Sequence, residues 1–514
     1  MVSIIRPYFK SVQLALLSGV LLGLSVPGIG LWPLAWIGLV PALYALTRCE
    51  SYTQAFCQGL VLGGVYYGIL FWWFWGLHPL TWMGFSMVTS PLATALAWGM
   101  AMGSQTIILA IIWLAVYACY RKLGKRGLLL APVWWVLGIW FLNQQPLGLP
   151  WGFLTYTQAG VPACRDAVFR LTFWGFESLM IMVNVLIVLR YPTRIPKLTP
   201  FAKGCSLPSG AGEGNDKDPS PAPLGREGLL GEPIPSIGNR LTLQPRVGLT
   251  GILLFFILNA YFPLHNNNRL YQTLQPMAIQ GNLSIEAERL YLNQNDRNAY
   301  YQTLIQKALR QYPQTKLILL PEGVLTKYWP FQTPIPLLAG GIYAVDRHYY
   351  NGALLFQKQK PPQYMAKRIL VPFGETTPFI PDAWMQAWLK PFGIEYSLGF
   401  QTGSWDQSPL TLAGFKIGPL ICFEALYPTL TQHYRHEGVQ LLVTFSNLGW
   451  YHQHPMLEQQ FLAINQIRAA ETHTPLILVT NTGVSAFIDN RGRILSRASS
   501  GSLKLFKFND DNSL

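Results

Sequence analysis

Long runs of apolar residues dominate the first half of the chain. Residues 51–120 and 127–164 contain no Asp, Glu, Lys or Arg. A helix needs about 20 predominantly apolar residues to cross a bilayer, and only a helix satisfies its own backbone hydrogen bonds there. The pattern therefore predicts seven spanning helices, near residues 11–27, 31–47, 55–77, 90–119, 127–143, 167–189 and 247–263.

The first apolar run also has features of a signal peptide, because Arg6 and Lys10 precede it. The apolar pattern resumes directly after this run, which favours a retained helical hairpin over a cleaved signal. Lys and Arg favour cytoplasmic loops, and here they gather at Arg48, at 121–126 and at 190–203. We therefore expect the N-terminus inside, and everything after about residue 264 on the outer face of the membrane.

After about residue 270 the apolar runs become short and alternate with longer helical patterns. Strand-like runs such as KLILLPEG, KIGPLICFE and VQLLVTFSN alternate with helix-like stretches such as HPMLEQQFLAINQIRAAETH. This alternation is typical of an α/β domain. Residues 200–236 are rich in Pro, Gly and Ser and predict a disordered cytoplasmic linker. We expect a membrane domain at 1–264 and a second domain at 265–514.

Composition and cysteine placement sharpen this picture. Hydrophobic residues make up 50% of the chain and charged residues only 12%. The net charge of +14 partly reflects the cytoplasmic loops, so it gives no support to a nucleic-acid partner. Cys422 is the only cysteine after Cys205. An unpaired thiol on the oxidising side of a membrane is either a small buried hydrophobe or a reactive group.

Reactive side chains occur at three successive strand ends. LILLPEG contains Glu322, YMAKRILVPFGE contains Lys367 and Glu375, and GPLICFE contains Cys422. A carboxylate can take the thiol proton, the thiolate can attack a carbonyl carbon, and an ammonium can stabilise the oxyanion. A nearby lysine would also lower the pKa of the thiol. These residue types predict a nucleophilic acyl-transfer site.

Several ordered motifs carry a family resemblance. PEG at 321–323, K-x4-PFGE at 367–375 and CFE at 422–424 resemble the Glu-Lys-Cys motifs of the nitrilase superfamily. SNLGWY at 446–451, RAAE at 468–471 and TNTG at 480–483 add to this likeness. The preceding spans and PWGFLTYTQ at 150–158 narrow the resemblance to the apolipoprotein N-acyltransferase family. It covers nearly the whole chain and implies a multi-pass helical membrane domain followed by a nitrilase-like α-β-β-α sandwich.

The resemblance also implies roles for individual residues. Glu322 matches the general base, Lys367 the oxyanion-stabilising lysine and Cys422 the nucleophile. The remaining matched positions are supporting or substrate-binding ones: Glu375, Glu424, Trp450, Phe423, Asn447 and Asn481.

The chain departs from the family pattern at a few places. Leu320, Phe423 and Leu448 stand where the family often has Trp, Tyr and an acid, and no tryptophan follows QGN at 280–282. The C-terminal sequence LKLFKFNDDNSL is too polar for the eighth span that is typical of the family. These differences affect the substrate loops and leave the three triad positions intact.

The activity implied by the resemblance is a ping-pong acyl transfer at the bacterial inner membrane. Cys422 would take a fatty acyl group from a phospholipid and pass it to the N-terminal amine of a diacylglyceryl apolipoprotein. No metal or other cofactor is expected, and the chain is expected to act as a monomer. Two alternatives stay open: a membrane-tethered, nitrilase-like amidase that uses water, and a membrane scaffold with an inactive domain.

Three further features allow a functional or a structural interpretation. Glu177 lies inside a predicted span, where an acid is often functional, although a hydrogen bond between helices is equally simple. His452 and His454 lie on a polar loop, and we expect them to be exposed rather than metal-bound. The aromatic segment 66–82 is predicted to border the lipid entrance, although anchoring at the membrane interface explains it equally well.

Overall fold

The computed structural model describes residues 2–142, 144, 148–192, 245–261, 264–265, 269–326, 333–372, 374–376, 381, 383–384, 387 and 399–508. The linker predicted at 200–236 lies outside the described residues, as does Cys205.

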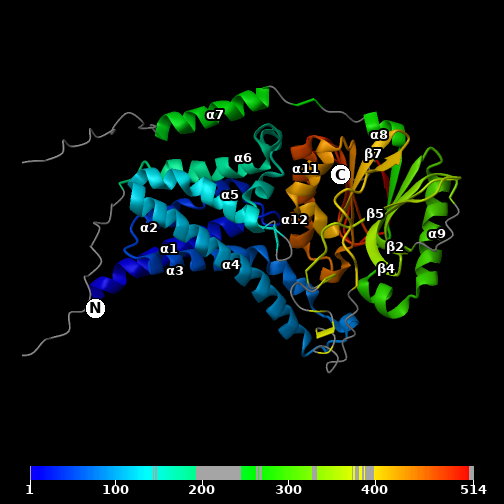
Figure 1. Cartoon of the computed structure of the whole chain (residues 1–514), viewed down its shortest axis with the longest axis horizontal. Coiled ribbons are helices and arrows are strands. Elements are labelled where there is room, and N and C mark those ends of the chain that lie inside the picture. Colours follow the sequence, from blue (N-terminus) through cyan, green and yellow to red (C-terminus); the bar gives the residue numbers. More distant parts are fainter. Residues whose placement is uncertain are drawn as a thin grey trace, which may run out of the picture.

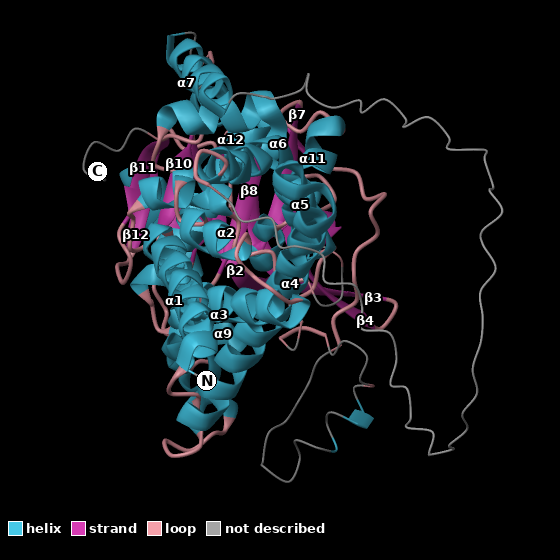
Figure 2. Ribbon diagram, turned by 90° about the vertical axis from the view of Figure 1, so that its left-hand side faces the viewer, coloured by secondary structure: helices cyan, strands magenta, loops and turns pink. Residues whose placement is uncertain are grey.

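The first half of the chain is helical. The α-helices are α1 (Val2–Ser25), α2 (Val40–Leu46), α3 (Tyr52–Leu70), α4 (Ser90–Leu123), α5 (Ala131–Leu142), α6 (Pro162–Val188) and α7 (Pro245–Tyr261). Short 3-10 helices connect them: η1 (Trp32–Trp36), η2 (Trp72–Leu77), η3 (Thr81–Met83), η4 (Gly124–Leu130) and η5 (Leu154–Gln158). Figures 1 and 2 show α1 to α6 gathered into one bundle.

The seven predicted spans are only partly recovered as helices. Within the described residues, Ser90–Phe141 and Pro162–Val188 are long and apolar enough to cross a membrane. Shorter apolar helices lie at Lys10–Ser25, Trp32–Leu46 and Gly248–Ile257. The second predicted span, 31–47, is not one continuous helix, because it consists of η1 and the seven-residue α2. The number of seven crossings is therefore not confirmed.

One face of α4 is both apolar and exposed. Leu92, Leu96, Met100, Ile107 and Ile111 are each more than half exposed. Their spacing of about one or two helical turns places them on one side of the helix. Contiguous exposed apolar surface of this kind marks an interaction surface for lipid or protein.

The second half forms two six-stranded sheets. The first has the order β12-β1-β2-β3-β4-β5 and the second the order β11-β10-β9-β8-β7-β6. The strands of the first sheet are β1 (Pro276–Gln280), β2 (Leu317–Thr326), β3 (Leu337–Val345), β4 (His348–Phe356), β5 (Gln363–Ala366) and β12 (Lys504–Lys507). Those of the second are β6 (Leu410–Leu412), β7 (Phe415–Ile421), β8 (Leu441–Ser446), β9 (Leu476–Thr480), β10 (Ser485–Ile488) and β11 (Ile494–Ala498).

Helices cover the outer faces of the two packed sheets. Among the described residues of this half, the α-helices are α8 (Arg269–Leu274), α9 (Gln294–Gln311), α11 (Pro428–His436) and α12 (Pro455–Thr472), and a short π-helix lies at Ala287–Tyr291. In Figure 1, α9 lies on the far side, while α11 and α12 lie between the sheets and the helical bundle. The predicted α-β-β-α sandwich is therefore confirmed.

Parallel pairing brings three strand ends to one edge of the second sheet. Strands β7, β8 and β9 are neighbours and parallel, with Ile421 opposite Phe445 and Ser446 opposite Thr480. The residues that follow these strands are Cys422, Asn447 and Asn481. Polar groups at the carboxyl ends of adjacent parallel strands lie close together, which is where α/β proteins commonly place their sites.

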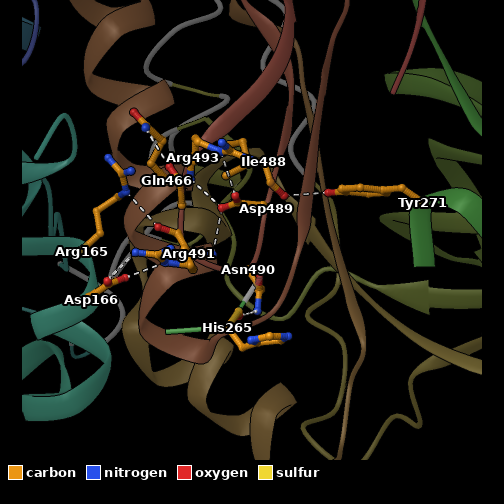
Figure 3. A network of polar contacts seen from close by, with 11 residues as sticks. Arg165, Asp166, His265, Tyr271, Gln466, Ile488, Asp489, Asn490, Arg491 and Arg493 are labelled. Atoms are coloured by element: carbon orange, nitrogen blue, oxygen red, sulfur yellow. Dashed lines mark hydrogen bonds and ion pairs between the residues drawn. The ribbon is translucent and has the colours of Figure 1, made fainter. Parts of the chain in front are cut away.

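Polar contacts join the helical bundle to the sandwich. The Arg491 guanidinium donates to both carboxylate oxygens of Asp166, at 3.1 and 2.6 Å. Arg165 Nε donates to the carbonyl oxygen of Arg491 at 2.8 Å, and Gln466 Nε2 on α12 donates to that of Ala159 at 3.4 Å. Figure 3 shows Arg165 and Asp166 of α6 facing Arg491 in the turn that follows β10. One hydrophobic core cluster also contains residues of both halves.

Candidate active site

Cys422 lies at a sharp turn between a strand and a 3-10 helix. It follows β7 directly, begins η8 (Cys422–Leu426) and has a φ of +50°. A non-glycine residue with positive φ is strained, and such strain is common where a fold presents a reactive side chain. The Ser446 hydroxyl donates a hydrogen bond to Cys422 Sγ at 3.3 Å. The thiol is half-buried and oriented by the end of the neighbouring strand.

Glu322 lies at a bulge in β2. The pairing of β2 with β3 shifts between Leu320 and Leu325, which face Ala339 and Gly341. The extra residues on β2 bend the strand, as bulges beside active sites commonly do. Gly340 is required here, because a Cβ at this position would lie 2.6 Å from the Cα atom of Glu322.

Lys367 is held between two carboxylates. Its Nζ lies 2.9 Å from Glu375 Oε2 and 3.0 Å from Glu375 Oε1, and 3.8 Å from Glu322 Oε1. Asn351 Nδ2 donates to Glu322 Oε1 at 3.0 Å and to Glu375 Oε1 at 2.7 Å. Glu375 Oε2 also accepts the Val371 N–H at 2.8 Å. Glu375 therefore fixes the ammonium beside Glu322.

The electrostatics of this group favour a neutral thiol at rest. Burial raises the pKa of Cys422 to about 12, and Glu322 raises it further, while Lys367 lowers it. The expected lowering by lysine is present, but burial outweighs it. Burial also raises the pKa of Glu322, as does the nearby Glu375, while Lys367 and the Asn351 hydrogen bond lower it. Burial lowers the pKa of Lys367, yet Glu375 and Glu322 reverse this and leave it raised. The thiol therefore needs a base, and Glu322 is in place to act as one.

Glu424 joins two segments of the site through their backbones. Its Oε1 accepts the N–H groups of Arg368 at 2.6 Å and Ile369 at 3.2 Å, and its Oε2 accepts that of Ile421 at 2.7 Å. Burial raises the pKa of Glu424 to about 7, against these backbone hydrogen bonds. The carboxylate thus ties the residue before Cys422 to the residue after Lys367. Glu424 therefore fixes the backbone on which Cys422 and Lys367 stand.

The two predicted asparagines meet a carboxylate that the sequence analysis did not single out. Asn447 Nδ2 donates to Glu288 Oε2 at 2.8 Å, and Asn481 Nδ2 donates to Glu288 Oε1 at 2.9 Å. Glu288 lies in the π-helix Ala287–Tyr291, and π-helical turns occur frequently at functional sites. Burial raises the pKa of Glu288, and coulombic coupling with Glu322 raises it further. This carboxylate therefore belongs to the same site.

The two predicted aromatic residues lie at the margin of the site. Phe423 is buried, with its ring 5.4 Å from that of Tyr427. Trp450 is half-buried in η9 (Leu448–Tyr451), with its ring 4.8 Å from that of Trp82. The Arg289 guanidinium lies 5.4 Å from the Trp450 ring centroid.

Aromatic contacts link the loop after β8 to the helical bundle. Burial raises the pKa of Tyr451, and the nearby Cys422 raises it further. The Tyr451 ring lies 4.9 Å from that of Trp73 and 6.2 Å from that of Phe74, both in η2. Trp73 Nε1 in turn donates to Gln460 Oε1 at 3.1 Å. Part of the aromatic segment 66–82 therefore packs against the loop that follows β8.

Glu177 forms hydrogen bonds between helical segments, as the structural rather than the functional interpretation of this residue predicts. Its Oε1 accepts from Trp135 Nε1 and from the Leu154 N–H, each at 3.0 Å. Its Oε2 accepts the Thr155 N–H at 2.8 Å and the Thr155 hydroxyl at 2.6 Å. These bonds hold η5, in which the Tyr156 hydroxyl donates to the Leu426 carbonyl at 3.2 Å. Glu177 thus supports the turn after Cys422 from inside the bundle.

The two histidines of the polar loop differ in their surroundings. His452 is exposed, and its ring nitrogens lie 2.7 Å from the Gly76 carbonyl oxygen and 2.8 Å from Glu286 Oε1. His454 is half-buried, so its expected exposure is wrong.

Three residues of the site escaped the sequence analysis, namely Asn351, Ser446 and Glu288. Asn351 lies in the middle of β4, and its place depends on the antiparallel pairing of β3 with β4. Ser446 stands at the start of the SNLGWY motif, which was a usable signal. Glu288 lies in LSIEAERL, after QGN. The sequence analysis noted that this segment lacks a tryptophan but did not select its acid as a site residue.

Comparisons with known proteins agree with this architecture. Residues 18–186 match the model of the apolipoprotein N-acyltransferase N-terminal domain, and residues 294–506 match that of the carbon-nitrogen hydrolases. The chain is 28% identical to the apolipoprotein N-acyltransferase of Geobacter metallireducens, over 94% of this chain and 85% of that protein. It is 27% identical to those of Gloeobacter violaceus (95% and 86% covered) and Azotobacter vinelandii (96% and 88%). The chain belongs to the apolipoprotein N-acyltransferase family.

Proposed function

We propose that this chain transfers a fatty acyl group from a membrane phospholipid to the N-terminal amine of a diacylglyceryl apolipoprotein, through a thioester on Cys422. The observation that carries the proposal is the grouping of a strained thiol with Glu322 and Lys367, beside aromatic residues of an apolar helical bundle. The family membership supports the same chemistry.

In the first half-reaction, Glu322 takes the thiol proton as Cys422 Sγ attacks the ester carbonyl carbon of the phospholipid. The Lys367 ammonium, fixed by Glu375, stabilises the oxyanion that forms. The tetrahedral intermediate collapses by breaking the ester C–O bond. Glu322 returns its proton to the departing oxygen, so a lysophospholipid leaves and the acyl thioester remains.

In the second half-reaction, the acceptor amine attacks the thioester carbonyl carbon. A thioester is less resonance-stabilised than an oxygen ester, so an amine attacks it readily. The C–S bond breaks, and the sulfur of Cys422 regains a proton by way of Glu322. The products are an N-acylated lipoprotein and the free thiol, and no redox step is involved.

The helical half fits lipid substrates. Moving an acyl chain into water costs about 0.8 kcal/mol per CH₂, which for a sixteen-carbon chain is on the order of 12 kcal/mol. A site that meets the bilayer surface avoids this cost. The exposed apolar stripe on α4 supports membrane embedding, and the Lys and Arg distribution supports a catalytic domain on the outer face.

The lipid entrance is proposed at the contact between η2–η3 and η9. Trp73 and Trp82 come from the helical half, and Tyr451 and Trp450 come from the loop after β8. Aromatic side chains favour the membrane–water interface, and this group adjoins the loop that follows Ser446. A phospholipid that enters here reaches the thiol without leaving the apolar surroundings.

The test uses the purified full-length chain in phospholipid micelles with a diacylglyceryl peptide that has a free N-terminal cysteine amine. Mass spectrometry should detect acyl-Cys422 first and N-acylated peptide afterwards. Cys422→Ala should form neither, whereas Cys57→Ala, which removes a free thiol in α3, should form both. Release of free fatty acid alone would indicate the hydrolase alternative, and absence of acyl-enzyme in the unmodified chain would contradict the proposal.

A further inference from the structure

Glu288 is a carboxylate held in place by two neutral amides. Asn447 and Asn481 each donate one hydrogen bond to it, from the ends of the adjacent strands β8 and β9. Asn447 follows Ser446, whose hydroxyl contacts Cys422 Sγ. Asn481 is completely buried and also accepts the Leu283 N–H and the Tyr301 hydroxyl, each at 3.1 Å. The end of β8 therefore positions both Glu288, through Asn447, and the thiol, through Ser446.

The charge of Glu288 is not neutralised by an ion pair. Across the described ranges, no Lys, Arg or His nitrogen lies within 4.0 Å of its carboxylate oxygens. The charged and titratable groups that act on it from a greater distance are Arg297 and Tyr301 on α9, Arg289 on its own turn, and Glu322 on β2. Lys367 is already paired with Glu375. A half-buried carboxylate without a cationic partner is suited to bind a cation supplied by a substrate.

Aminolysis of the thioester needs one proton acceptor more than hydrolysis does. An α-amine has a pKa of about 7.7–8.0, so at neutral pH most of the acceptor is an ammonium that cannot attack. It must lose one proton before attack and a second after the C–N bond has formed. Glu322 can carry the second proton to the sulfur of Cys422. A base on the acceptor side can take the first proton within the site.

We propose that Glu288 binds the α-ammonium of the acceptor and takes its first proton, which makes it a catalytic residue of the second half-reaction. This rests on the proposed acyl transfer. The ammonium N–H bond breaks and its proton passes to the Glu288 carboxylate. The free amine then forms the C–N bond, the C–S bond breaks, and the second amine proton reaches the sulfur through Glu322. Glu288 afterwards releases its proton to solvent.

The proton affinity of Glu288 matches this task. Burial raises its pKa to about 7, while the Asn447 hydrogen bond, Arg297 and Arg289 lower it and Glu322 raises it. A base with a pKa near the working pH transfers protons most effectively.

The test measures each half-reaction of the Glu288→Gln variant separately, by rapid quench and intact-protein mass spectrometry. Transfer to a diacylglyceryl peptide should slow by about tenfold at pH 7, because only about a tenth of the amine is then uncharged, and this loss should exceed any change in the rate of acyl-Cys422 formation. The deficit should shrink above about pH 8, where the free amine predominates. Hydroxylamine is mostly uncharged at neutral pH and needs no first deprotonation. It should therefore cleave the thioester of the unmodified chain and that of Glu288→Gln at the same rate.

A matched control and a conservative variant complete the test. Glu286→Gln removes a carboxylate two residues earlier, one that contacts His452 instead of the asparagines, and should leave the pH profile of transfer unchanged. Glu288→Asp keeps the charge and should recover part of the transfer rate at pH 7.

The outcomes are distinct. Transfer by Glu288→Gln at the unmodified rate at pH 7 would overturn the assignment. So would equal losses of acyl-enzyme formation and of transfer in both Glu288 variants, since that pattern indicates a structural role. Absence of acyl-Cys422 in the unmodified chain would instead contradict the proposed function itself.

Discussion

Replacing Glu424 with glutamine tests whether a residue that does not contact the reacting atoms sets their geometry. In the folded chain its carboxylate accepts the N–H groups of Arg368, Ile369 and Ile421 at 2.6, 3.2 and 2.7 Å. Glutamine has the same shape but only one accepting oxygen. If that oxygen faces Arg368 and Ile369, the amide NH₂ faces the Ile421 N–H, and two donors oppose each other.

The magnitude follows from these bonds. A hydrogen bond to a charged group contributes about 1.5–3 kcal/mol, and a buried donor left without a partner costs about 1–3 kcal/mol. Glu424→Gln should therefore lower the free energy of unfolding by about 2–4 kcal/mol. The turn before Cys422 is then no longer tied to the segment after Lys367. Since a displacement of about 1 Å can cost about 10²-fold in rate, acylation should slow by that order.

The assay is the rate of acyl-Cys422 formation, with thermal unfolding measured in parallel. Glu437→Gln is the control, because Glu437, the residue after α11, forms a partly exposed ion pair with His433 at 3.6 Å, and such a pair contributes about 0–1 kcal/mol. Acylation by Glu424→Gln at the unmodified rate would refute the view that this carboxylate aligns the site.

The pKa of Glu424 adds a signature in pH. Burial raises it from 4.5 to about 7, so the folded chain binds this proton more tightly than the unfolded chain does. The contribution of this group to the free energy of unfolding is therefore present below about pH 4.5 and is lost as the pH rises to about 7. The carboxylate that accepts all three N–H groups predominates only above about pH 7. Acylation should rise with pH across this range, and Glu424→Gln should remove the part of the rise that Glu424 contributes, while the part set by Glu322 remains.

Three further outcomes are expected. Because burial raises the pKa of Glu322, the acid limb of acyl-enzyme formation should lie at a pH above the ordinary range of a glutamate, and a limb near pH 4.5 would contradict its role as base. Gly340→Ala places a Cβ 2.6 Å from the Cα atom of Glu322 and should reduce acylation at least about tenfold, whereas Gly99→Ala, with open space around it, should not. Gln460→Leu leaves two buried indole N–H groups without their acceptor, at about 1–3 kcal/mol each, and should lower the melting temperature; an unchanged melting temperature would contradict this account of the interface.

The sequence was informative where chemistry demands a residue type at a strand end. Glu322, Lys367, Glu375 and Cys422 were found by motif and spacing, and the fold brings all four together. Asn351 was not found, because it becomes part of the site only when β4 pairs with β3 in one register. Register depends on packing across the whole sheet and leaves no local signal.

The chain's hydrophobic pattern determined by itself that a helical, apolar half precedes an α/β half, because the period and length of apolar runs follow directly from helix and strand geometry. It did not determine how many helices cross a membrane, since length and apolarity qualify only two stretches of the described chain. Tertiary structure alone decided whether the pKa of the Cys422 thiol is raised or lowered. The sequence indicated a lysine that lowers its pKa, whereas burial, which depends on the assembled core, raises it to about 12. It also decided that Glu288 stands beside the site, because two strand ends distant in sequence hold it there.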